Sequence, residues 1–178
     1  MTRRLGIFCV VAALAAGGAV LRAAESLRIV PTVGGDRVLV SFELSDAFTD
    51  EIRETISSGL RTTFTYDVEL RMVVPAWVDR TVATSEVSVS DEYDNLTRRH
   101  TLTRIVDGRV EDTVVTEDEA AVKAWLTSFT RMPLCRTAKL DASRDYYVRI
   151  RARSKPHGTS LLGWASTISG EARFTFVP

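Results

Sequence analysis

The stretch Thr62-Thr-Phe-Thr-Tyr-Asp-Val-Glu-Leu-Arg-Met-Val-Val74 decides the fold predicted for this chain. Apolar residues occupy every second position, and polar or charged residues occupy most of the positions between them. Because successive side chains of a β-strand point to opposite sides of the sheet, this alternation predicts a strand with one apolar face. At about 3.3 Å per residue the strand would be roughly 40 Å long. A second layer must cover its apolar face.

Shorter β-rich runs lie on both sides of this stretch. Gly34-Gly35-Asp36 and Asp107-Gly108 are turn sequences between two such runs, and both are typical of antiparallel hairpins. The strands predicted besides the long one cover residues 27–32, 37–44, 82–89, 96–106, 109–115, 134–140, 146–153 and 171–177. About nine strands joined mostly by short turns indicate antiparallel pairing.

Two helical segments are predicted as connections. Thr49 is a suitable cap for the first, which carries an apolar stripe and stops at Gly59. The second opens at Thr116, continues through an apolar stripe to Phe129, and is expected to end at Pro133.

The predicted fold class is therefore mainly β: an antiparallel two-layer β-sandwich, immunoglobulin-like, with two short connecting helices. The immunoglobulin-like element is the sequence Leu140-Asp141 followed by Tyr146, which is typical of a corner where a tyrosine hydroxyl bonds back to the turn. Residues 25–178 are expected to form a single domain.

The first 24 residues have a different composition. Arg3 and Arg4 precede an apolar run over residues 5–21 that contains no charge. This pattern predicts a signal peptide cut after Ala23 or Ala24, and the alternative is an N-terminal anchor retained in the membrane. Both predict an exported protein in the periplasm or cell envelope, with membrane contact only through an uncleaved N-terminus.

Charge and cysteine usage exclude two classes of protein. Residues 1–24 contain three arginines and no acid, so the remainder carries 20 basic and 23 acidic residues, a formal charge of −3. A nucleic-acid-binding protein would be basic. Cys9 lies in the predicted signal, which leaves Cys135 alone and excludes a disulfide framework. We expect Cys135 to be a buried, inert thiol.

No catalytic, cofactor-binding or metal-binding residues are predicted. His100 and His157 lack a second ligand at metal-like spacing, and the serines lack a nucleophile-elbow motif. His100 is interpreted as a strand surface residue. Asp91, Glu92 and Asp94 lack the regular spacing of a calcium loop and are interpreted as a solvated turn.

Two features are candidates for binding a partner. The first is a basic stripe that the adjacent pair Arg98-Arg99 and the alternating Arg149, Arg151 and Arg153 would form if their strands lie near each other; forked guanidinium groups suit an anionic partner. The second is an apolar loop. The candidate partner-binding residues are Arg98, Arg99, Arg149, Arg151, Arg153, Leu161, Leu162 and Trp164. Two structural alternatives stay open. The arginines at 149, 151 and 153 would pair across strands with Asp67 and Glu69, and residues 161–164 would form a strand in the core.

Several blocks resemble an uncharacterised group of exported bacterial proteins, the domain-of-unknown-function family 4390. The resemblance rests on residues 48–59 leading into Phe64-Thr-Tyr-Asp-Val-Glu-Leu70, on residues 92–99, on Tyr146-Tyr-Val-Arg-Ile-Arg-Ala152, and on residues 163–176. These blocks span most of the chain after residue 24. The resemblance implies an exported domain without an assigned activity, and it implies no catalytic residue.

The expected function is that of a non-enzymatic cell-envelope interaction module that binds a protein or membrane-associated partner. The alternative is a small-ligand carrier, or a periplasmic sensor accessory, with a pocket between the sheets. A hydrolase with an unrecognised site is the third hypothesis. An apolar cavity open to solvent would favour the carrier, and buried acids beside a cleft would favour the hydrolase.

Overall fold

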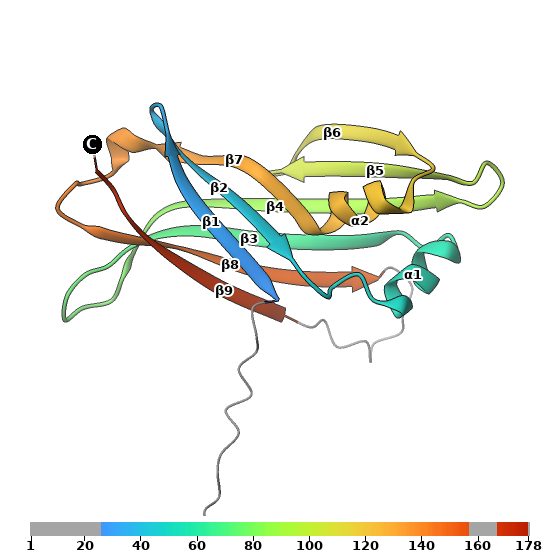
Figure 1. The fold of residues 1–178 in the computed structure, drawn as a ribbon, viewed down its shortest axis with the longest axis horizontal. Coiled ribbons are helices and arrows are strands. Elements are labelled where there is room, and N and C mark those ends of the chain that lie inside the picture. The colour runs from blue at the N-terminus through green and yellow to red at the C-terminus, as the bar shows by residue number, and fades with distance from the viewer. Residues whose placement is uncertain (1–25, 157–166, 178) are drawn as a thin grey trace, which may run out of the picture.

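The computed structural model describes residues 26–156 and 167–177, which fold into nine strands, two α-helices and one short 3₁₀ helix, η1 (Figure 1). The strands are β1 (Leu27–Gly34), β2 (Arg37–Leu44), β3 (Thr62–Met72), β4 (Arg80–Asp94), β5 (Arg99–Val106), β6 (Arg109–Thr116), β7 (Ser128–Arg136), β8 (Asp145–Pro156) and β9 (Thr167–Thr175). The helices are α1 (Asp50–Ser57), α2 (Glu119–Thr127) and η1 (Thr137–Lys139).

The strand β3 lies inside a six-stranded antiparallel sheet of order β6-β5-β4-β3-β8-β9. It pairs with β4 on one edge and with β8 on the other. Phe64, Tyr66, Val68 and Leu70 are each at most 1% exposed, whereas the residues between them are partly exposed. The predicted strand with one apolar face is therefore confirmed, although it ends at Met72 rather than at Val74.

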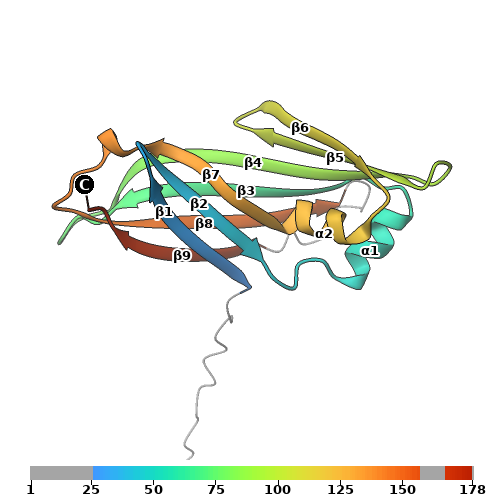
Figure 2. The ribbon, with the colours of Figure 1, turned by 45° about the horizontal axis from the view of Figure 1, so that its top comes forward.

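A three-stranded sheet of order β1-β2-β7 covers part of the apolar face (Figures 1 and 2). Phe42 from β2 and Phe129 from β7 pack against Tyr66 from β3, with ring centroids 5.0 and 5.1 Å from that of Tyr66. These contacts join the two sheets into a mainly β, two-layer sandwich. The predicted fold class is confirmed.

The helices α1 and α2 lie together at one end of the sandwich (Figure 1). The Thr49 hydroxyl caps α1 by accepting a hydrogen bond from the Ile52 N–H at 3.3 Å. Ile56 from α1 and Val122 from α2 are both buried in the core. The Tyr66 hydroxyl donates a 2.6 Å hydrogen bond to the Leu126 carbonyl at the C-terminal end of α2, so α2 is attached directly to β3.

The structure corrects several predicted boundaries. The second helix is capped by Asp118 rather than Thr116 and ends at Thr127, and Pro133 lies within the edge strand β7 instead of ending the helix. Proline is tolerated there because β7 is paired only with β2 among the described residues. The predicted strand over residues 134–140 is the end of β7 followed by η1.

The predicted tyrosine corner is present at the start of β8. The Asp141 N–H donates a 2.7 Å hydrogen bond to the Tyr146 hydroxyl oxygen, and Tyr146 is 1% exposed. The turn before β8 is thereby attached to the core, as expected from the immunoglobulin-like pattern.

Replacing Tyr66 by Phe should destabilise the protein by about 1–3 kcal/mol, because the buried Leu126 carbonyl loses its donor. Tyr93→Phe is the matched control, since the Tyr93 hydroxyl has no hydrogen-bond partner among the described residues. Urea unfolding measures both variants. Equal free energies of unfolding for the two would show that the Tyr66 hydroxyl does not attach α2 to the sheet.

Candidate functional site

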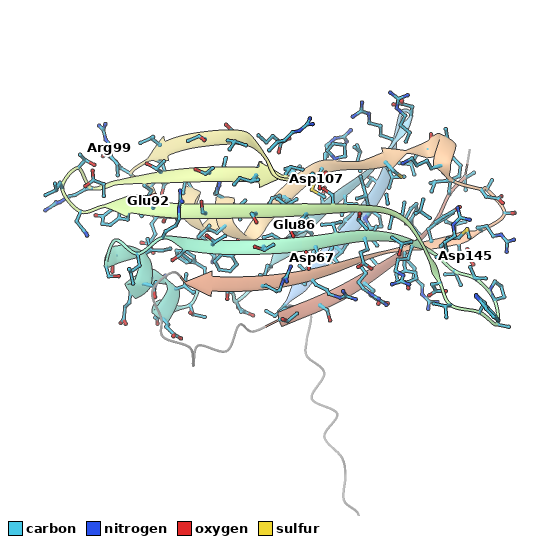
Figure 3. All side chains as sticks on the ribbon, turned by 180° about the vertical axis from the view of Figure 1, so that it is seen from behind. Asp67, Glu86, Glu92, Arg99, Asp107 and Asp145 are labelled. Carbon is cyan, nitrogen blue, oxygen red and sulfur yellow. The ribbon has the colours of Figure 1, made fainter. Side chains whose placement is uncertain are left out.

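The predicted arginine ladder lies on the outer face of the six-stranded sheet. In the β3–β8 register, Arg149 stands opposite Glu69, Arg151 opposite Asp67, and Arg153 opposite Thr65. Figure 3 views this face and shows Asp67 beside Glu86 of β4. The ladder therefore shares its face with acidic side chains.

Each arginine of the ladder has an acidic neighbour. Arg153 Nη2 donates to both carboxylate oxygens of Asp67, at 2.9 and 2.8 Å. Arg151 Nη1 is 3.7 Å from Glu69, and Arg149 Nε donates to Glu171 of β9 at 2.7 Å. The hydrogen bond to Glu171 raises the pKa of Arg149. The cross-strand pairing expected with Asp67 and Glu69 is observed for Arg151 and Arg153, whereas Arg149 pairs with Glu171 on its other side.

Arg98 and Arg99 do not extend the ladder. They lie at the β4–β5 turn, and β5 is separated from β8 by β4 and β3, a span of about 14 Å at the usual strand spacing. Arg98 is exposed, and Arg99 Nε donates to Glu117 at 3.0 Å. Leu161, Leu162 and Trp164 fall outside the described residues.

A different apolar feature, the β3–β4 loop, is exposed instead. Trp77 is 81% exposed and Val78 is 74% exposed on this loop, which we define as residues 73–79. It projects at the end of the sandwich opposite the helices (Figure 1). Adjacent exposed apolar side chains form the kind of surface found at interaction sites.

Hydrogen bonds hold the β3–β4 loop in place. The Asp79 carboxylate accepts from the Tyr147 hydroxyl at 2.8 Å and from the Val74 N–H at 3.2 Å. The Arg71 guanidinium donates to the Asp79 carbonyl at 2.8 Å, and the Trp77 N–H donates to the Val74 carbonyl at 3.1 Å. The bond from Tyr147 is the main reason why the pKa of Asp79 is lowered. The loop is therefore presented in a fixed shape.

Sequence reasoning missed this loop because Trp77 and Val78 continue the apolar side of the long strand beyond Pro75. The chain turns instead, and Ala76 adopts a positive φ of 60°. The available signal was the position of Trp77 two residues after Pro75, where a strand normally ends.

His100 and Asp91 form a buried pair that the sequence interpretation also missed. Asp91 lies within β4 with a side chain that is 0% exposed, and its Oδ2 is 2.9 Å from Nδ1 of His100, whose side chain is 12% exposed. The predictions of a surface histidine and of a solvated turn at Asp91 are wrong, because the alternation of Val87 and Val89 continues through Asp91. Burial raises the pKa of Asp91, and the hydrogen bond with His100 opposes that shift.

A carboxylate that orients an imidazole in this way is one part of a catalytic triad. Within the described ranges no hydroxyl forms a hydrogen bond with the other ring nitrogen of His100. The same ranges contain no group of three or more side chains suited to hold a metal ion. The His100 ring instead packs on Tyr93, with centroids 4.6 Å apart.

Two described cavities are lined by residues of both sheets. One measures about 200 Å³ and is lined by Ile52, Phe64 and Ile168 among others, and the other measures about 190 Å³ and is lined by Val87, Arg104 and Met132 among others. Pockets for small organic ligands usually measure about 300–1,000 Å³. Elsewhere between the sheets the rings of Phe42, Tyr66 and Phe129 are in contact. Cys135 is free and half-buried, not fully buried as expected.

Fold and surface together define an antiparallel β-sandwich protein with an anchored, exposed apolar loop. The model of a domain of unknown function, DUF4390, matches residues 22–159, and the chain belongs to this family. No curated protein and no solved structure matches the chain. None of the helices in the described ranges is long and apolar enough to cross a membrane.

Removing the acids opposite the arginine ladder should create an anion-binding face. The double substitution Asp67→Asn with Glu69→Gln leaves Arg151 and Arg153 without their acidic neighbours. We expect this variant to be retained on an immobilised sulfated polysaccharide at a salt concentration that elutes the wild type. The control is Asp112→Asn with Glu111→Gln, which makes the same charge change on β6. Equal retention of the two variants would contradict the neutralising role of Asp67 and Glu69.

Asp79→Asn should alter the acid stability of the protein. Because the folded-state pKa of Asp79 lies below its ordinary value of 3.8, its stabilising contribution is present above pH 3.8 and is lost as the pH falls through the folded-state value. The wild type should therefore lose more stability than the variant between pH 6 and pH 3. Denaturant midpoints at both pH values measure this difference, and identical pH profiles would contradict it.

Proposed function

We propose that this protein is an exported, non-enzymatic cell-envelope module that binds a protein or membrane-associated partner. The observation that carries the proposal is the β3–β4 loop, which holds Trp77 and Val78 in solvent on a hydrogen-bonded frame. A preorganised loop loses little conformational freedom on binding, so more of the contact energy is available for affinity. Tryptophan is also among the residues most enriched at binding hot spots.

Export is supported by the N-terminal sequence. Arg3 and Arg4 precede the uncharged apolar run over residues 5–21, the arrangement of a signal peptide or an N-terminal anchor. This supports a periplasmic or cell-envelope location, where a membrane-associated partner would be within reach.

The arginine ladder contributes less to the proposal than the β3–β4 loop. Its guanidinium groups already have carboxylate neighbours, and an anionic partner would have to displace them. The carrier alternative is weaker for a different reason, since both cavities described between the sheets are smaller than a usual ligand pocket.

Trp77→Ala should weaken partner binding at least about tenfold, because hot-spot tryptophans contribute this much or more. Its stability should change by less than about 0.5 kcal/mol, since the side chain is 81% exposed. The measurement is photo-crosslinking from position 78 in the native envelope, followed by quantification of the crosslinked product.

Leu96→Ala is the matched control, because Leu96 is 95% exposed on the β4–β5 turn at the other end of the sandwich. The crosslinked product should persist in this variant. Recovery of a copurified small molecule with no crosslinked partner would overturn the proposal, as would a product unaffected by Trp77→Ala.

A further inference from the structure

We infer that the protein has a second, separate site: a phosphate-binding pocket between the ends of β2 and β7, formed by Arg37, Arg136 and Lys139. These side chains line a cavity of about 400 Å³ together with Pro133, Leu134 and Cys135. The inference does not depend on the β3–β4 loop, because none of these residues belongs to it.

The first supporting observation is the register of the two strands. Arg37 of β2 stands directly opposite Arg136 of β7, so the two side chains emerge on the same face as cross-strand neighbours. Like charges in this position destabilise a sheet. The β3–β8 register shows the opposite arrangement, in which Glu69 stands opposite Arg149. The Arg37–Arg136 pairing is therefore not explained by the stability of the fold.

The second observation is the shortage of acids around the pocket. Arg136 and Lys139 form no ion pair with any described residue. Arg37 has one acidic neighbour, Asp36, whose carboxylate is 3.9 Å away. Both side chains of that pair are more than half exposed, so solvent screens their interaction strongly. The pocket retains a net positive charge that an anion would neutralise.

The third observation is that the backbone holds the cations in position. The Thr137 N–H donates a 2.8 Å hydrogen bond to the Asp36 carbonyl, which joins the start of η1 to the β1–β2 turn. The Leu140 N–H donates to the Thr137 carbonyl at 2.8 Å and closes the η1 turn that carries Lys139. Arg37 and Arg136 are themselves fixed at a strand pair.

The lining indicates the chemistry of the ligand. Two guanidinium forks and one ammonium suit a phosphate oxyanion, because arginine binds phosphate with two parallel hydrogen bonds and lysine supplies a compact charge. Pro133 and Leu134 form an apolar wall beside these groups. A phosphate group with an attached apolar portion would contact both kinds of surface. Its source is either a soluble phosphate compound or an anionic lipid headgroup.

The experiment titrates the full chain with inorganic phosphate at constant ionic strength and follows the amide resonances of residues 134–139. The wild type should show a saturable shift, and Arg136→Gln should weaken the affinity about tenfold because a charged hydrogen-bond donor is lost. Arg109→Gln, an exposed arginine on β6, is the control and should bind as the wild type does. Equal loss of affinity in both variants would overturn the inference. The absence of a saturable shift in the wild type would also overturn it, unless the vesicle measurement below shows binding that requires Arg136.

Two further measurements separate binding from folding and identify the source. Without phosphate, Arg136→Gln should unfold at the same denaturant concentration as the wild type or a higher one, since the like-charge contact is relieved; a lower one would give Arg136 a structural role and overturn the inference. Vesicles of phosphatidylglycerol, compared with phosphatidylcholine, test the lipid source. Binding to the anionic vesicles that requires Arg136 assigns a lipid headgroup, binding of inorganic phosphate alone assigns a soluble phosphate, and binding of neither overturns the inference.

Discussion

The arrangement of this molecule depends on the two faces of β3. Because β3 is hydrogen-bonded on both edges, it cannot rotate, and its alternation determines which residues meet on each side of the sheet. On one side Tyr66 contacts Phe42 and Phe129 and donates a hydrogen bond to α2. On the other side Asp67 and Glu69 lie within reach of the β8 arginines. A register slip of one residue would disrupt both surfaces at once.

The same constraint explains why two sets of arginines differ in availability. Those on β8 have an acidic strand beside them, and each has a carboxylate neighbour. Those at the β2–β7 edge have a neighbouring strand that supplies another arginine. Arginine content therefore does not indicate an anion-binding site; whether an acidic residue lies opposite or diagonally across the register decides whether the charge is paired. That residue is set by strand pairing, which is a tertiary property.

The sequence could predict features that are set by local patterns, but not those that are set by strand pairing. Strict alternation through residues 62–72, turn chemistry at Asp107-Gly108 and the Thr49 cap are local signals, and each predicted its element. The Asp91–His100 pair and the Arg37–Arg136 contact join residues on different strands, so no local pattern contains them. The predicted second helix is longer than α2, because the apolar stripe in the sequence continues past Thr127 to Phe129, which is buried in β7.

The two ends of the molecule differ in the side chains that they expose. At the end that carries α1 and α2, buried residues of both helices close the core and Arg53 pairs with Glu119, while Leu96 and Arg98 of the β4–β5 turn are exposed. The opposite end carries the β3–β4 loop, the β1–β2 turn and the segment after β7 (Figures 1 and 2). Exposed tryptophan and unpaired cations thus occur at the same end, although they lie on different sheets. An apolar contact and a charge contact made by one partner would reinforce each other there, because the second forms without a further loss of translational freedom. A surface that offers both phosphate and an apolar layer, as an anionic membrane does, would meet both requirements simultaneously.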